Sequence, residues 1–232
     1  MRHFLLPLIA LLQPVSGCGP GTPDYFPLDG PRTREFRLSV ETADEHATHR
    51  QLLHHAGTVH RDGREVGVFE HSAGGRQYYV RTAEGVRWIA TARAEDGAVT
   101  AQAGEPFVIR EPVTVGMEWE VPSRLALAES VFHDNGERVR SRQTPVTLRH
   151  VIVGGGEEVT TPAGHFEGCL RVHATGRAIV RVNWGANFGT VEVDQTDWYA
   201  PGIGLVKSRR IETSDSPYLK PGESMLELAR YD

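Results

Sequence analysis

Histidines gather in one part of this sequence, where their spacing raises the question of a metal site. Imidazole is the commonest metal ligand near neutral pH, and His46 and His49, with Glu45 beside them, would share one face of a helix. The order Glu-His-x-x-His differs from the His-Glu-x-x-His of zinc proteases, and residues three apart on a strand point to opposite faces. We therefore expect solvated loop histidines and keep one alternative, a metal site drawn from His46, His49, His54 and His55.

Motifs for a recognised catalytic centre are missing from the sequence. It contains no Gly-x-Ser-x-Gly elbow, no phosphate-binding Gly-x-x-x-x-Gly-Lys loop, no Cys-x-x-Cys and no Asp-rich calcium loop. We therefore expect no enzymatic activity and no cofactor. Because catalytic groups need be close only in space, a hydrolase with an unrecognised site stays open as an alternative and predicts a buried cluster of polar groups beside a cleft.

The start of the chain has the three parts of an export signal. Arg2 and His3 form a basic tip, residues 4–12 an apolar core, and small residues precede Cys18. The core is shorter than the roughly 20 residues of a spanning helix, and Pro7 would kink a helix there, so we expect residues 1–17 to be removed.

Residues 15–18, Val-Ser-Gly-Cys, resemble the lipobox of bacterial lipoproteins. That resemblance implies cleavage between Gly17 and Cys18 and acylation of Cys18 by lipid, the only covalent group we expect. Acyl chains contribute about 0.8 kcal/mol per buried CH₂, so they would hold a water-soluble domain on a membrane. The alternative is an ordinary secretory signal followed by a chance cysteine. Acylation of Cys18 would leave Cys169 without an intrachain partner, and we expect it to be buried and unreactive.

Composition excludes one class of partner and outlines the organisation. The formal net charge of −5 argues against nucleic acid, whose phosphates require a basic face. Residues 18–32 are rich in proline and glycine and predict a tether, although the apolar run Tyr25-Phe26-Pro27-Leu28 should dock on the domain. Residues 33–232 form the single β-rich domain that we expect to follow.

Within residues 33–232, apolar positions recur with period two, as in Phe36, Leu38 and Val40. Many short strands with hairpin spacing predict a mainly all-β fold: an antiparallel, strongly curved sheet, either a half-barrel or an irregular barrel, with little helix. Residues 123–131 could form a short helix, and Gly154-Gly155-Gly156 is one of the expected turns.

Two loop sequences and one aromatic loop are distinctive. Pro162-Ala163-Gly164 and Pro201-Gly202 predict hairpin turns, with Gly204 allowing a bulge or close packing as the next strand starts. Trp184 and Phe188 lie in a glycine-containing loop, where aromatic side chains could bind lipid, sugar or protein. Alternatively, both rings fold back on the sheet.

These motifs together resemble a group of uncharacterised bacterial envelope lipoproteins. The resemblance rests on the lipobox and on residues 25–28, 115–119, 162–166 and 199–206. It implies a curved sheet similar to those of envelope proteins that hold acyl chains or partner proteins, and fold similarity alone assigns no function. The sequence departs from that group at residues 30–33, Gly-Pro-Arg-Thr, where the group often has Gly-x-x-Trp.

Our leading hypothesis is a lipid-anchored, non-enzymatic protein of the cell envelope whose curved sheet binds an apolar ligand or an envelope protein. An assembly or structural partner without a ligand pocket is the main alternative. By resemblance to lipoprotein sorting signals, Gly19 in place of Asp after Cys18 favours the outer membrane, facing the periplasm.

The anchor is testable by metabolic labelling. Cells expressing the full chain and given an alkyne-tagged palmitate should incorporate the tag into the wild type, whereas the Cys18→Ser variant should remain unlabelled because it lacks the acceptor thiol. Equal labelling of the two proteins would refute lipidation at Cys18.

Overall fold

The fold is a long antiparallel β-sheet that curves around residues 22–30. The computed structural model describes residues 22–30, 32–42, 46–72, 74–94, 96–127, 129–134, 137–140, 144–181 and 188–232. The expected signal peptide, Gly17, Cys18, Gly19 and Trp184 lie outside these described residues.

Sixteen strands and no helix occur in the described part of the chain. In chain order they are β1 (Thr33–Thr42), β2 (His46–Arg61), β3 (Arg64–His71), β4 (Arg76–Thr82), β5 (Gly85–Ala92), β6 (Val99–Ala101), β7 (Phe107–Arg110), β8 (Glu118–Arg124), β9 (Glu129–Asp134), β10 (Glu137–Arg140), β11 (Pro145–Thr161), β12 (Gly164–Arg181), β13 (Phe188–Ala200), β14 (Gly204–Ser214), β15 (Leu219–Lys220) and β16 (Gly222–Tyr231).

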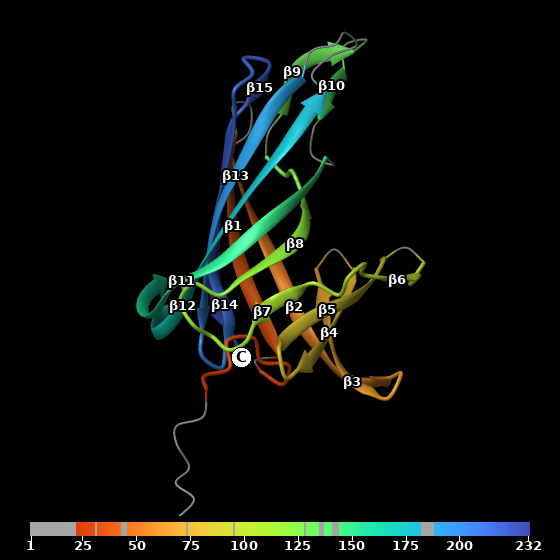
Figure 1. Cartoon of the computed structure of the whole chain (residues 1–232), viewed down its shortest axis with the longest axis vertical. Coiled ribbons are helices and arrows are strands. Elements are labelled where there is room, and N and C mark those ends of the chain that lie inside the picture. Colours follow the sequence, from red (N-terminus) through yellow and green to blue (C-terminus); the bar gives the residue numbers. More distant parts are fainter. Residues whose placement is uncertain are drawn as a thin grey trace, which may run out of the picture.

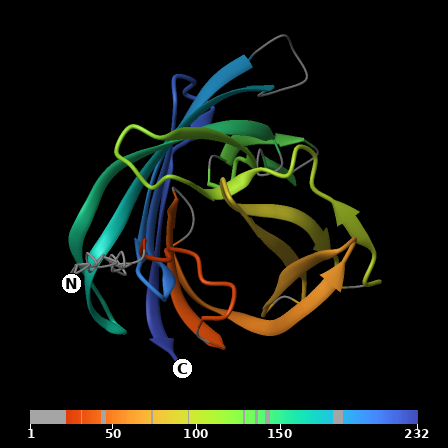
Figure 2. The ribbon, with the colours of Figure 1, turned by 60° about the horizontal axis from the view of Figure 1, so that its bottom comes forward.

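Thirteen of these described strands make one antiparallel sheet in the order β6-β5-β4-β3-β2-β1-β16-β14-β13-β12-β11-β8, with β7 paired to β5. β10, β9 and β15 form a small second sheet at one end of the molecule (Figure 1). The large sheet curves strongly, as Figure 2 shows, but its end strands do not pair with each other. Arg110 Nη1 on β7 donates to the Glu118 carbonyl on β8 at 2.9 Å, across this opening. The prediction of a strongly curved antiparallel sheet is confirmed.

Alternation of buried and exposed residues explains why the strands form. Along β11, Val146, Leu148 and Ile152 are buried whereas Thr147 and Arg149 are exposed. On the outer face of the sheet, Glu35 binds both Arg50 at 2.7 Å and Arg230 at 2.8 Å, across three neighbouring strands. Exposed pairs of this kind contribute little stability, but they keep the outer face charged and solvated.

The N-terminal segment, residues 22–30, closes one end of the concave face (Figure 2). Tyr25 and Phe26 are buried, and the Phe26 ring lies 5.0 Å from Tyr79 and 5.9 Å from Phe69 between ring centroids. Arg81 binds Asp24 at 2.6 Å and the Phe26 carbonyl at 3.0 Å. The expectation that residues 25–28 dock on the domain is confirmed.

Cys169 belongs to a second apolar cluster, formed where the β11–β12 hairpin packs near β16. Its side chain is fully buried, as expected from the sequence. Burial raises the pKa of the Cys169 thiol to about 11, so the thiol is protonated at neutral pH.

The structure contradicts the short helix that residues 123–131 could have formed. Ser123 and Arg124 end β8, Leu125 and Leu127 are both buried, and β9 begins at Glu129. Side chains two apart point the same way only in extended chain. The buried carboxylate of Glu212 accepts the backbone N–H groups of Ala126 and Leu127, each at 2.9 Å, and this tertiary contact overrides the local helix preference.

The turn expected at Gly154-Gly155-Gly156 is also wrong. β11 runs through it to Thr161, with register shifts relative to β12 between Ile152, Gly154, Glu157 and Val159. Glycines here make bulges that bend a continuous strand. The hairpin turns come where Pro162 and Pro201 predict them, and Gly202 has the positive φ of 71° that a type II turn requires.

Replacement of Phe26 tests whether the N-terminal segment is part of the core. Phe26→Ala should lower the free energy of unfolding by about 3–5 kcal/mol, because it removes a buried aromatic side chain. Chemical denaturation of the full chain, followed by tryptophan fluorescence, measures the change. Phe188→Ala is the control: Phe188 is 62% exposed, so its effect should stay within about 0.5 kcal/mol. Equal effects of the two variants would contradict docking of the segment.

Candidate ligand-binding site

The four histidines considered as metal ligands lie along one strand, β2, and not in a loop as expected. His46 lies 3.9 Å from Glu41, His54 lies 3.5 Å from Thr33, and His55 stacks on Phe69. Within the described residues, no three His, Cys, Asp or Glu side chains lie close enough together to hold a metal ion. The structure therefore does not bring these four histidines together.

Of the two aromatic residues in the loop considered for binding, the structure describes Phe188. Phe188 begins β13 with 62% of its surface exposed, so its ring does not fold back on the sheet. Because Trp184 lies outside the described residues, a binding role for this loop stays a prediction.

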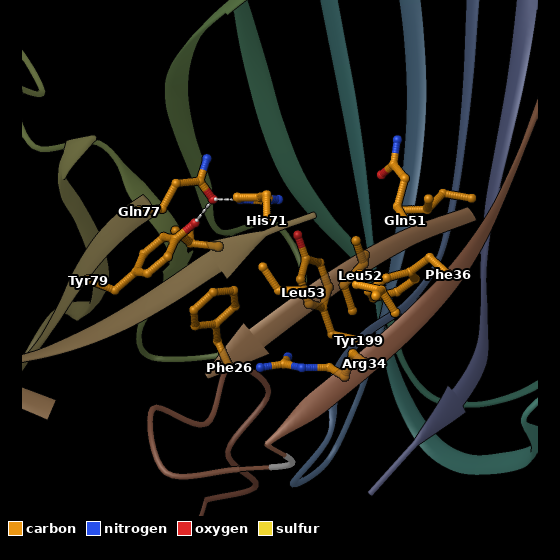
Figure 3. Close-up of a pocket in the computed structure, with 13 residues that line it drawn as sticks. Phe26, Arg34, Phe36, Gln51, Leu52, Leu53, His71, Gln77, Tyr79 and Tyr199 are labelled. Atoms are coloured by element: carbon orange, nitrogen blue, oxygen red, sulfur yellow. Dashed lines mark hydrogen bonds between the residues drawn. The ribbon is translucent and has the colours of Figure 1, made fainter. Parts of the chain in front are cut away.

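A pocket of about 210 Å³ lies on the concave side of the sheet, above the N-terminal segment (Figure 3). Thirteen residues line it, and most are apolar or aromatic: Phe26, Arg34, Phe36, Gln51, Leu52, Leu53, His71, Gln77, Tyr79, Val108, Tyr199, Leu205 and Leu226. They come from eight strands and the N-terminal segment and are far apart in sequence. Curvature of the sheet is what brings them to one place.

Polar side chains mark the outer part of the pocket. Gln51 and His71 are exposed, so they lie where the pocket meets solvent. Gln77 Oε1 accepts a hydrogen bond from Tyr79 Oη at 2.6 Å, and His71 Nε2 lies 2.7 Å from the same oxygen (Figure 3). Burial raises the pKa of Tyr79 well above its ordinary value, so the phenol is a neutral donor.

Arg34 is the charged group deep in the pocket. It is 2% exposed, its Nη1 donates to the Ile203 carbonyl at 3.0 Å, and its guanidinium carbon lies 5.2 Å from the centre of the Phe69 ring. Burial lowers the pKa of Arg34 to about 10, so the group is still a cation at neutral pH. Its Nε and Nη2 are buried and have no hydrogen-bond partner among the described residues.

Gly204 makes room for this cation. It has a φ of +94°, and a Cβ atom at this position would lie 2.7 Å from Arg34 Nη1. A side chain at residue 204 would thus be both strained and in contact with the guanidinium. The close packing expected at Gly204 is confirmed, and the neighbour it serves is Arg34.

A second buried polar cluster lies further along the concave face, on β13 and β14. Asp197 accepts two hydrogen bonds from Gln195 Nε2, at 2.8 and 3.1 Å, and Arg210 binds Glu212 at 2.8 Å. Burial raises the pKa of Asp197 and lowers that of His150. These groups bind one another and, through Glu212, the chain after β8, so we assign the cluster a structural role.

Arg34 was not singled out from the sequence, although a signal for it exists. The alternation of Phe36, Leu38 and Val40 extends back by one step to residue 34. An arginine in register with an apolar face predicts a buried cation, and this is what the structure shows.

Comparisons with known proteins give a family model and two solved structures. Residues 113–216, less than half of the chain, match a model described as DUF3108-like. A candidate exported protein with a YmcC-like fold from Bacteroides fragilis has 15% identity and a TM-score of 0.40, covering 87% of this chain and 96% of that one. A candidate lipoprotein from Parabacteroides distasonis has 16% identity and a TM-score of 0.40, covering 90% and 99%. None of the curated proteins matches. The described residues include no helix able to cross a membrane.

Paired substitutions in one turn test the packing of Arg34. Gly204→Ala and Gly202→Ala both place a side chain at positive φ, which costs about 1–2 kcal/mol. Only residue 204 would also press on Arg34, since nothing lies within 4 Å of a Cβ at residue 202. Gly204→Ala should therefore lower the denaturation midpoint more than Gly202→Ala. Equal midpoints would show that Arg34 is not held against the turn.

Proposed function

We propose that this protein is a lipid-anchored, non-enzymatic protein of the cell envelope that binds an apolar small molecule in the pocket lined by Phe26, Leu53 and Tyr199. The pocket lining is the single observation that carries the proposal: nine of the thirteen residues are aliphatic or aromatic. Each CH₂ group that a ligand buries there would contribute about 0.8 kcal/mol, enough for an alkyl chain to bind without further contacts.

The place of the pocket along the chain supports a ligand that comes from a membrane. Phe26, which closes the pocket, is only eight residues after Cys18. A fully extended chain advances at most about 3.6 Å per residue, so an acylated Cys18 would hold Phe26 within about 29 Å of the lipid surface. The sorting resemblance of Gly19 supports the outer membrane, facing the periplasm, as the location.

A non-catalytic role is supported by the groups within the pocket. Its polar residues are Arg34, Gln51, His71 and Gln77, apart from the two tyrosines. A hydrolytic site would need a nucleophile beside a base. No serine or cysteine is among the described residues that line this pocket.

Ligand retention tests the proposal. Organic extracts of the full chain, purified from membranes, should contain an alkyl-chain molecule at near-equimolar amount by mass spectrometry. Leu226→Trp should reduce that amount about tenfold, because overpacking of a filled site costs about 1–3 kcal/mol. Val59→Trp is the control, since Val59 is 44% exposed and lies outside the pocket lining. Equal amounts of the same alkyl-chain molecule in extracts of the wild type, Leu226→Trp and Val59→Trp would refute ligand binding in this pocket.

A further inference from the structure

The pocket contains a buried cation without an anion, and this observation specifies the ligand class. Resting on the proposed function, we infer that the ligand is a single-chain amphiphile with a free carboxylate, a fatty acid in chemical class, and that Arg34 binds the carboxylate while the apolar walls hold the chain.

Arg34 carries a buried positive charge that is not paired with a negative one among the described residues. An ionised side chain loses the solvation of water on burial and is normally paired with an opposite charge. Exposed arginines of this protein are paired in that way: Arg37 binds Glu227 and Arg209 binds Glu223, each at 2.7 Å. In the described part of the chain, the hydrogen bonding of Arg34 consists of one carbonyl, at Ile203, which leaves its positive charge without a balancing anion.

The unused atoms of Arg34 have the geometry that a carboxylate needs. Nε and Nη2 form one edge of the planar guanidinium, and such an edge binds a carboxylate through two parallel hydrogen bonds. Both atoms are covered in this structure, so a ligand would bind them by displacing the side chains around them. The remaining nitrogen, Nη1, is the one that donates to Ile203. Lining residues supply no Asp or Glu that would compete with an incoming anion.

The titratable groups that face Arg34 from neighbouring strands are neutral, so they supply no charge to balance it. The pKa of His55, on β2, is lowered first by burial and then by the nearby charge of Arg34. The imidazole of His55 is therefore neutral at neutral pH. His55 Nε2 is buried without a hydrogen-bond partner among the described residues. The phenol of Tyr79, on β4, is neutral because burial raises its pKa.

The size and walls of the pocket fit part of an alkyl chain. An apolar cavity of about 150 Å³ binds benzene, which has six carbons. By that measure the pocket volume of about 210 Å³ holds about eight carbons. The rest of a longer chain would leave past Gln51 and His71, at the exposed side of the pocket.

Photo-crosslinking with two matched probes tests this inference. Membranes containing the full chain are treated with a photoactivatable, alkyne-tagged hexadecanoic acid or with the corresponding hexadecanol, both with the diazirine within the first ten carbons. Crosslinks are mapped by mass spectrometry to peptides containing Leu52, Leu53 or Tyr79. Without ATP and coenzyme A in the membranes, the acid remains a free carboxylate.

In the wild type, the acid should label these peptides about tenfold more than the alcohol, because hydrogen bonds to charged groups are the strong ones. Arg34→Gln should bring the two probes to similar labelling, whereas Arg34→Lys should keep part of the preference. Arg37→Gln, a change of the same residue type on the outward side of β1, should leave the preference unchanged.

The outcomes separate this inference from the proposed function. Absence of labelling by both probes would overturn both. Equal labelling of the wild type by acid and alcohol would overturn the role of Arg34 and leave an apolar pocket standing. Should Arg34→Gln fail to accumulate as folded protein, the acid-to-alcohol ratio of the wild type decides, and a ratio near one overturns the inference.

Discussion

The contact of Phe26 with Phe69 and Tyr79 is the one on which the rest of this structure depends. An antiparallel sheet that curves but does not close leaves its concave face to be covered by something else. Here residues 22–30 cover one end of that face, and Phe26, Tyr79 and Phe69 pack with centroid distances between 5.0 and 5.9 Å. Without this contact, the pocket would lack its floor and Arg34 would be open to water.

Two groups of buried polar side chains on the same concave face differ in whether their hydrogen bonds are satisfied within the described chain. Around Asp197 and Glu212, buried polar groups satisfy one another and the backbone, as buried networks in stable proteins do. Arg34 is as deeply buried, yet two of its donors have no partner in the described chain. The cluster around Asp197 and Glu212 is complete by itself, whereas a ligand would complete the hydrogen bonding of Arg34.

The parts of the fold that depend on local chemistry could be predicted from the sequence. Period-two alternation indicated the strands, prolines 162 and 201 the hairpin turns, and the apolar run at residues 25–28 a docked segment. Expectations that failed depend on contacts distant in sequence. Glu212 binds the extended chain at Ala126 and Leu127 from 86 and 85 positions away. β12 pairs with β11 at Gly154 and on both sides of the glycine run, and so keeps that strand continuous.

The pocket itself could not be predicted, because the curvature that assembles it comes from the pairing of the whole sheet. Arg34 is the partial exception, since its register with Phe36 was visible in the sequence. The most direct test of the account is a crystal structure of the full chain purified from membranes without removal of bound lipid. It should show elongated electron density in the pocket, ending within hydrogen-bond distance of Arg34 Nε and Nη2. A pocket filled by ordered water, or Arg34 paired with a carboxylate of its own chain, would contradict it.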